Sequence, residues 1–292
     1  MRVKKNIKKP GYLLTVILVI AICVVLALLL TVNWLSLNRL TKDNEYLEAQ
    51  TEEYKEKAEK IQADWDAEKL AAQTDSSFDY LAIGNSITKH PVYGDYWWGE
   101  WGMAASAAET DYFHRVAFHI SQLYAENTTE ALNFTVWEDP FYDRDKTLPY
   151  LKGYLNENLD LVTVQLGENI QKSEDQSDEE YAMQLEMDWR SLLVYIRDQA
   201  PKANVMVIGQ FWADDVQDTV KQSLCQELAM TYIPLNSIQG DEYRAGVGAV
   251  VMGADQNSHT IEADGVGQHP NDEDHAFISQ RILENIPGMV LE

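Results

Sequence analysis

The chain has 292 residues, of which 47 are acidic and 23 are basic, and its formal net charge is −24. All 47 acids but only 18 of the 23 bases follow residue 35, so this part carries a net charge of about −29. Such a surface repels nucleic acid and anionic lipid headgroups, and nucleic-acid binding is therefore not expected. The two cysteines, Cys23 and Cys225, leave the part after residue 35 with neither an internal disulfide nor a Cys-based zinc site.

The amino-terminal segment predicts a membrane anchor. Residues 1–10 form a basic tail, and no charged residue occurs from residue 11 to residue 35. About twenty apolar residues in a helix span a bilayer, so 11–35 is predicted to be a transmembrane helix. The basic tail predicts a cytoplasmic amino terminus, a single pass through the cell membrane and an extracytoplasmic remainder. A cleaved signal peptide is the alternative, but the apolar run is longer than usual and no small-residue cleavage site follows it.

Residues 36–72 read as a helical stalk without glycine or proline. Four apolar residues recur every seven positions, Leu40, Leu47, Tyr54 and Ile61. A second series of heptad positions is poorer, because it includes Asn44 and Thr51. The pattern allows a coiled coil that makes a homo-oligomer, or a single solvated helix that acts as a spacer. A short polar linker at 73–77 separates the stalk from the domain at 78–292.

After the linker, short apolar runs alternate with longer amphipathic segments, which is typical of a parallel sheet covered by helices. Strands are expected at 80–83, 133–137, 159–166, 205–208 and 232–235. Helices are expected at 111–125, 148–158, 178–200, 215–230 and 272–286. Right-handed crossovers would build a three-layer α/β/α domain with a parallel sheet, and the loops after the strands would meet at one edge.

Residues that can do chemistry fall in four of these loops. Gly84-Asn85-Ser86 ends the first strand, and Gly102 follows a tryptophan-rich stretch. Gly167-Glu168-Asn169 follows the third strand, and His269-Pro270-Asn271-Asp272 precedes the last helix. Gly-Asn-Ser alone is ordinary turn sequence. Ligands bind at the carboxyl ends of strands in open α/β sheets, however, so a serine in that place is a candidate for chemistry.

In this order and spacing the four blocks resemble the SGNH (GDSL-like) hydrolase family over most of residues 78–286. The resemblance implies that Ser86 is the nucleophile and His269 its general base. It also implies an oxyanion hole made by the backbone N–H groups of Ser86 and Gly102 and the side-chain amide of Asn169. The residue types suit these roles, because an imidazole that titrates near neutrality can take the serine proton. Preorganised N–H donors, each worth about 3 kcal/mol, stabilise the charge of the tetrahedral intermediate.

The sequence departs from the family pattern at the acid that orients the histidine. Members commonly carry an aspartate three residues before the histidine, and Val266 stands there in this chain. Asp264 is the first candidate for the role, since a glycine-containing loop could bring it back to the ring. Asp255 and Asp272 are the fallbacks, and a Ser-His dyad assisted by a backbone carbonyl is a further possibility. Ile170 also stands where the third block usually ends in aspartate.

Four aromatic residues are candidates to line a cleft for a sugar substrate: Trp98, Trp101, Phe211 and Trp212. Packing in the core or in loops is the alternative, because tryptophan buries a large apolar area wherever it lies. The histidines form no His-x-x-x-His pair with a carboxylate at zinc-ligand spacing. No metal and no cofactor are therefore expected.

The function expected from these features is that of a membrane-anchored, extracytoplasmic serine esterase. Its substrate would be an O-acyl ester, above all an O-acetyl group on a cell-surface or exported carbohydrate. An O-acyltransferase would use the same acyl-enzyme and pass the acyl group to a sugar hydroxyl. An alternative of another class is a catalytically idle domain on a coiled-coil stalk that binds glycan or assembles a surface complex, and Val266 in place of the aspartate favours it.

Overall fold

The computed structural model describes residues 30–31, 34, 41–42, 77–139 and 143–286. The predicted basic tail lies outside these residues, and so do nearly all of the transmembrane helix at 11–35 and the stalk at 36–72, which stay predictions. In the described residues, no helix combines the length and the hydropathy that a bilayer crossing requires. The backbone divides into two compact units, Met1–Lys60 and Ile61–Glu292, and the second contains the predicted α/β domain.

The main sheet of this domain has five parallel strands in the order β2-β1-β3-β4-β5. Their bounds are β1 (Ser77–Gly84), β2 (Glu126–Asn133), β3 (Leu161–Gln165), β4 (Asn204–Ile208) and β5 (Thr231–Ile233). The carboxyl ends of β1 and β3 are adjacent, since Gly84 pairs with Gln165. The loops that follow these two strands therefore begin side by side, which is where ligands bind in such sheets.

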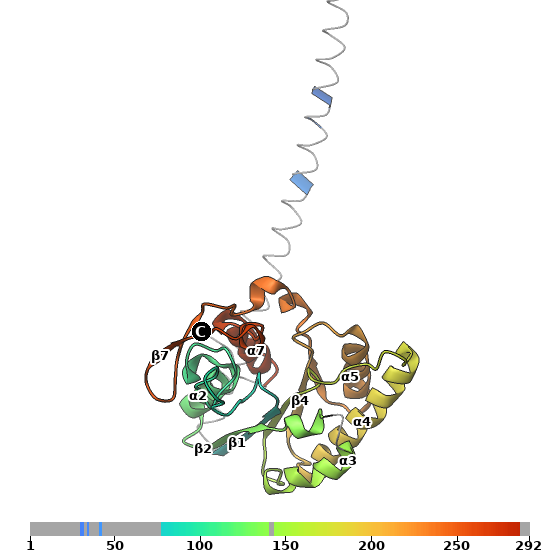
Figure 1. Cartoon of the computed structure of the whole chain (residues 1–292). Helices are drawn as coiled ribbons and strands as arrows, with labels where there is room; N and C mark the ends of the chain where they lie inside the picture. The colour runs from blue at the N-terminus through green and yellow to red at the C-terminus, as the bar shows by residue number, and fades with distance from the viewer. Residues whose placement is uncertain (1–29, 32–33, 35–40, 43–76, 140–142, 287–292) are drawn as a thin grey trace, which may run out of the picture. The chain divides into compact units, whose positions relative to one another are not determined.

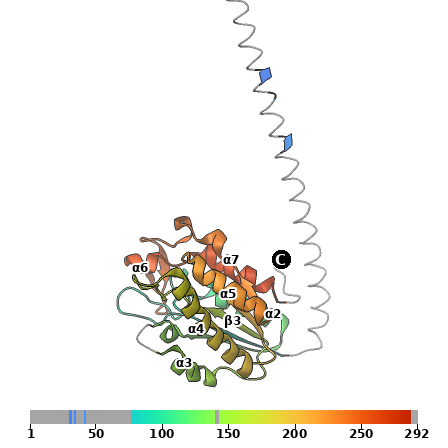
Figure 2. The same ribbon diagram turned by 90° about the vertical axis from the view of Figure 1, so that its right-hand side faces the viewer.

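Helices cover both faces of the sheet, which gives the three-layer α/β/α domain that the sequence predicts (Figure 1). One face packs against α2 (Tyr112–Leu123) and α7 (Asp272–Leu283). The other face packs against α4 (Asp178–Gln199) and α5 (Asp215–Glu227), which lie toward the viewer in Figure 2. Each helix buries an apolar stripe against one side of the sheet and leaves its polar side in solvent.

The side chains of β1 show how one strand serves both layers. Leu81 and Ile83 belong to the core beneath α4 and α5, whereas Tyr80 and Ala82 belong to the core beneath α2 and α7. None of the four is more than 1% exposed. Successive side chains of a strand point to opposite faces, so a strand buried on both faces reads as a continuous apolar run. That run made β1 predictable from sequence.

Two predicted elements are wrong. The strand expected at 133–137 is instead a 3-10 turn, η2 (Thr135–Trp137), and β2 precedes it. β2 is an edge strand whose residues are all at least partly exposed, so its polar sequence lacks the apolar signal. The helix expected at 148–158 is replaced by α3 (Arg144–Thr147) and the 3-10 helix η3 (Leu148–Gly153). Gly153 ends this segment, because glycine is a poor helix former.

The other predicted strands and helices are confirmed, with ends that shift by a few residues. Several short elements were not predicted: η1 (Ala108–Thr110), η4 (Asn236–Ile238), η5 (Asp241–Tyr243), α6 (Asp264–Gly267) and the antiparallel pair β6 (Val250–Met252) and β7 (Ser258–Thr260). A separate small core that includes Trp97, Trp101, Val251 and Val266 holds the hairpin and α6 together. This core fixes the chain immediately before His269.

Candidate active site

Ser86 lies in the turn that follows β1. Gly84 ends the strand in a space that no other residue fits, because a Cβ there would lie 1.8 Å from Thr88 Oγ1 and 2.7 Å from the Gln165 carbonyl oxygen. The side chain of Asn85 closes the turn, since its Oδ1 accepts from the Ile87 N–H at 3.0 Å. The turn thus presents Ser86 half-buried at the carboxyl edge of the sheet.

His269 contacts this serine, although it lies near the other end of the domain's sequence. Its Nε2 lies 2.8 Å from Ser86 Oγ, although 183 positions separate the two residues. His269 lies between α6 and α7, and its backbone N–H donates to the Val266 carbonyl at 3.0 Å. The predicted nucleophile and the predicted base are therefore within hydrogen-bonding distance, which proton transfer between them requires.

The other ring nitrogen of His269 contacts a backbone carbonyl and not a carboxylate. Nδ1 lies 2.9 Å from the Gly265 carbonyl oxygen. The expectation that Asp264 orients the ring is corrected, because Asp264 begins α6 and its side chain is exposed. The fallbacks are engaged elsewhere: Asp255 pairs with His259 at 2.9 Å, and Asp272 accepts from Ser106 Oγ at 2.5 Å.

This contact sets the tautomer of the ring. A carbonyl oxygen can only accept, so Nδ1 of His269 must carry the proton of the neutral ring, and the lone pair of Nε2 then faces the Ser86 hydroxyl. The arrangement is the Ser-His dyad with a backbone carbonyl, one of the possibilities left open by the sequence. A carbonyl dipole supports the imidazolium less strongly than a carboxylate does.

Trp212, from the loop after β4, covers the imidazole. Its ring meets the His269 ring edge to face, with centroids 5.1 Å apart, and its Nε1 donates to the Gln268 carbonyl at 3.3 Å. His269 is only 8% exposed. Burial, which disfavours the charged form, lowers the pKa of His269 to about 4 despite the bond to Gly265. The ring is therefore neutral and able to accept a proton through the neutral pH range.

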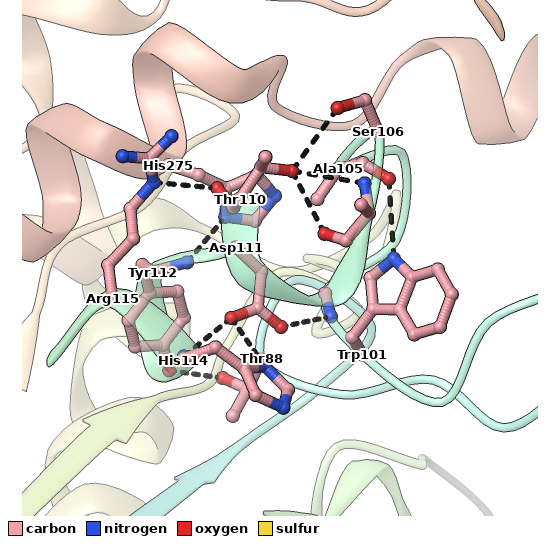
Figure 3. A network of polar contacts seen from close by, with 12 residues as sticks. Thr88, Trp101, Ala105, Ser106, Thr110, Asp111, Tyr112, His114, Arg115 and His275 are labelled. Atoms are coloured by element: carbon pink, nitrogen blue, oxygen red, sulfur yellow. Dashed lines mark hydrogen bonds and ion pairs between the residues drawn. The ribbon is translucent and has the colours of Figure 1, made fainter. Parts of the chain in front are cut away.

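Gly102 does not direct its N–H as expected. The group donates to Asp111 Oδ2 at 2.9 Å, which corrects the expectation that it faces a substrate oxygen. Figure 3 shows Asp111 in a polar network between the loop of Trp101 and helix α2. Its other oxygen accepts from the His114 N–H at 2.7 Å and so caps α2. A carboxylate that caps a helix N-terminus has a second oxygen free for another donor, and Gly102 provides it.

The glycine at position 102 has a packing role that is independent of this bond. A Cβ there would lie 2.5 Å from the Ile87 carbonyl oxygen and 2.8 Å from a ring carbon of His275. The loop also contacts the serine turn, because the Met103 N–H donates to the Ser86 carbonyl at 2.8 Å. Gly102 therefore allows its loop to approach the Ser86 turn closely.

The other two predicted oxyanion donors are better placed to reach a ligand. In the described part of the chain, the backbone N–H of Ser86 makes no hydrogen bond. Asn169 is exposed in the loop after β3, and its Nδ2 donates to Glu138 Oε2 at 2.6 Å. An amide nitrogen has two protons, so this bond leaves one for a substrate oxygen.

Glu138 is a site residue that the sequence analysis missed. It is 0% exposed and accepts hydrogen bonds from both loops of the site, through Asn85, Gly167 and Asn169. The residue follows the apolar run at 133–137 for which a strand is expected, so it carries no separate sequence signal. A carboxylate directly after a tryptophan is the sequence hint that it offers.

Glu168 and Lys221 stabilise the carboxyl edge of the sheet, where the site lies. Oε1 of Glu168 accepts from the Phe211 N–H at 2.8 Å, and burial raises the pKa of this carboxyl to about 8. Lys221 is fully buried, and its Nζ donates to the carbonyls of Leu166 at 2.7 Å and Ile208 at 3.0 Å. These bonds join the ends of β3 and β4, which carry the Asn169 and Trp212 loops.

The four aromatic residues predicted to bind substrate have different positions. Phe211 and Trp101 are buried, at 1% and 8% exposure, which favours the packing alternative for them. Trp98 is partly buried and stacks on His259, with centroids 4.4 Å apart. Trp212 packs its ring against His269. In the described residues, no group of three or more His, Cys, Asp or Glu side chains is arranged to hold a metal.

No family model matches the chain, and no curated protein matches it. Solved structures similar to it include an acetyl xylan esterase from Geobacillus stearothermophilus, at 18% identity over 74% of this chain and 97% of that chain, with a TM-score of 0.43. An inhibitor-bound aryl esterase of M. smegmatis has 16% identity over 73% of this chain and 100% of that chain, with a TM-score of 0.45. A carbohydrate esterase has 12% identity over 73% and 70% of the two chains, with a TM-score of 0.46. At these values the function must be argued from the site of this chain alone.

Proposed function

We propose that the domain is a serine ester hydrolase with Ser86 as nucleophile and His269 as general base. The observation that carries this proposal is the 2.8 Å contact between Ser86 Oγ and His269 Nε2 at the carboxyl edge of the sheet. A serine hydroxyl becomes a good nucleophile when a positioned imidazole takes its proton. The neutral, buried ring of His269 meets that requirement.

The proposed reaction proceeds through an acyl-enzyme. Ser86 Oγ attacks the ester carbonyl carbon while its proton passes to Nε2 of His269. The Nδ1 proton keeps its bond to the Gly265 carbonyl, so the imidazolium is held in place. Nε2 then returns the proton to the leaving alcohol, and the C–O bond of the ester breaks. Water repeats the sequence on the acyl-enzyme and restores Ser86. The Ser86 N–H and the Asn169 amide stabilise the negative oxygen in both steps.

The substrate class that we propose is an O-acetyl ester on a carbohydrate. The partly exposed ring of Trp212 beside His269 offers an apolar surface on which a sugar ring can stack. The basic tail and the apolar segment at 11–35 support a location on the outer face of the cell membrane, where acylated surface or exported glycans occur. A membrane anchor and possible oligomerisation through the stalk remain parts of this proposal.

Hydrolysis of p-nitrophenyl acetate and labelling by a fluorophosphonate probe test the proposal. Ser86→Ala should lower kcat by at least about 10³-fold and abolish labelling, because the nucleophile is lost. Ser121→Ala is the matched control, since Ser121 is an exposed serine of α2 whose hydroxyl donates to the Phe118 carbonyl. A folded wild-type protein that neither hydrolyses the ester nor takes up the probe would contradict the proposal.

The idle-domain alternative has a structural observation in its favour, besides Val266. The N–H of Gly102 is occupied by Asp111, so one of the three expected oxyanion donors is missing. This alternative predicts that Ser86→Ala leaves glycan binding and the cellular phenotype intact and that the probe does not react. An acyltransferase would instead label with the probe and release less acetate when a glycan acceptor is added.

A further inference from the structure

Glu138 is a buried carboxylate with no direct part in the proposed reaction. It lies in the turn after η2, and its backbone N–H donates to the Thr135 carbonyl at 2.9 Å. The preceding residue, Trp137, is fully buried and packs against Trp189, with centroids 4.9 Å apart. The position of the carboxylate is therefore fixed by the core beneath α4.

Three N–H groups converge on the two oxygens of Glu138. Oε2 accepts from Asn169 Nδ2 at 2.6 Å. Oε1 accepts from Asn85 Nδ2 at 3.1 Å and from the backbone N–H of Gly167. Asn85 directly precedes Ser86, and the other two donors belong to the loop after β3. One carboxylate thus joins the loop of the nucleophile to the loop of the oxyanion donor.

We propose that Glu138 is a positioning residue that holds the Asn169 amide with one N–H directed at the oxyanion, an inference that rests on the proposed function. Asn169 is exposed, so nothing but its hydrogen bonds prevents its amide from turning over. A turned amide would present Oδ1, an acceptor, to the negative oxygen of the intermediate. The bond to Glu138 fixes Nδ2 on the inner side and leaves its second proton for the substrate.

Only an acceptor fits this position. A glutamine at residue 138 would have the same shape, but its amide group would face a donor whichever way it turned. With the NH₂ group toward Asn169, the two donors oppose each other and Asn169 must turn over. With the NH₂ group toward Asn85 and Gly167, two donors are opposed, and one of them is a backbone N–H that cannot turn over, so the first orientation is favoured.

The charge of Glu138 and its positioning role predict opposite effects of Glu138→Gln on the rate. A negative charge near the developing oxyanion opposes it electrostatically. If Glu138 acted through its charge alone, Glu138→Gln would accelerate the reaction. Positioning predicts the opposite: loss of one oxyanion donor typically lowers kcat about 10²- to 10³-fold, and the donor at stake here is the Asn169 amide.

A double-mutant cycle on the full chain tests the proposal with p-nitrophenyl acetate. Glu138→Gln should lower kcat about 10²-fold and change KM little, and Asn169→Ala should lower kcat by a similar or larger factor. The double variant should be no slower than Asn169→Ala, because the oxygen of the glutamine still accepts from Asn85 and Gly167 and the substitution then acts through the Asn169 amide. Glu227→Gln, which removes an exposed carboxylate that pairs with Arg190, is the matched control and should retain wild-type kcat.

Two kinetic outcomes would overturn the proposal: a Glu138→Gln enzyme as fast as the wild type or faster, and multiplicative effects in the double variant. If Glu138→Gln does not fold, NMR on the wild-type protein decides. Its Asn169 side-chain signal, assigned by its loss in Asn169→Ala, should show one Nδ2 proton shifted downfield and slow to exchange. A rapidly exchanging amide would refute the inference. Failure of the proposed function is distinct, since the wild type would then show no Ser86-dependent turnover while the NMR signal would still report on Asn169.

Discussion

His269 combines burial with a neutral hydrogen-bond partner, and this combination sets the pH range of the proposed reaction. The base must be uncharged to accept the Ser86 proton. Because burial lowers the pKa of His269 to about 4, kcat/KM should remain constant down to about pH 5 and fall as pH decreases through about 4. An imidazole with the ordinary pKa of 6.5 would lose activity already near neutrality. The measurement is a pH profile of kcat/KM on an ester that is stable in acid, with circular dichroism at each pH to show that the protein is folded.

Asp264→Asn is the control for this profile. Asp264 is exposed and the Nδ1 atom of His269 contacts the Gly265 carbonyl, so the substitution should change neither kcat/KM nor the midpoint of its acidic limb. A loss of activity of about 10⁴-fold, the size seen when a triad aspartate is neutralised, would restore Asp264 as the orienting acid.

The sequence predicted that Ser86 and His269 come together, but it did not predict their surroundings. Ser86 and His269 could be named because each follows a recognisable pattern, a strand-turn sequence and a block before the last helix. The partner of Nδ1 could not be named, since a backbone carbonyl leaves no mark on the sequence. Asp111 shows the same limit: it was visible as a helix start, but only the fold shows that it takes up the N–H of Gly102.

The loop after β4 limits the access of solvent to the imidazole of His269, because it carries Trp212. Trp212→Ala should expose the His269 ring, weaken the effect of burial and move the acidic limb of kcat/KM upward, toward pH 6.5. Trp212→Phe keeps an aromatic ring over His269 and should leave the midpoint close to that of the wild type. The two pH profiles, recorded side by side, make the measurement.

An acidic limb that stays near pH 4 in Trp212→Ala would show that other residues desolvate His269.

The KM values of the same variants are informative about the substrate. Stacking of a sugar on Trp212 predicts that Trp212→Ala raises KM for an acetylated oligosaccharide more than for p-nitrophenyl acetate. Equal changes for the two esters would argue against a sugar surface at this position.

Most of the elements that the sequence predicted are long or buried on both faces, and the short edge strand β5 is an exception. β1, β3 and β4 are mostly apolar, and α4 is long enough for its buried stripe to be recognised. β2 was missed because an edge strand needs no apolar run. The 3-residue strands β6 and β7 are too short to show any period, and only the core around Trp97 and Val251 reveals why they form.

In the molecule as a whole, the proposed chemistry needs only the part that follows the predicted linker. The backbone divides at residue 60 into two compact units, and the described core clusters draw their members from Phe78 to Ile286. The second unit therefore contains the described hydrophobic cores together with Ser86, Asn169 and His269. We expect this unit to fold without the other, since a domain with its own hydrophobic core is stabilised by its own buried area.

A variant that begins at residue 73 should accordingly keep its esterase activity and lose its association with the membrane. Its kcat/KM on p-nitrophenyl acetate should lie within about twofold of the full chain, because no described site residue precedes Ser77. The full chain, expressed in bacteria, should sediment with membranes and require detergent for release, as an apolar segment of about twenty residues predicts. The shortened chain should remain in the supernatant.

Sedimentation equilibrium then tests the stalk: a chain that begins at residue 36 should be oligomeric if the heptads pair and monomeric if the stalk is a solvated helix. Membrane association of the shortened chain, or full-length protein in the supernatant, would contradict the anchor at residues 11–35 without affecting the assignment of Ser86 and His269.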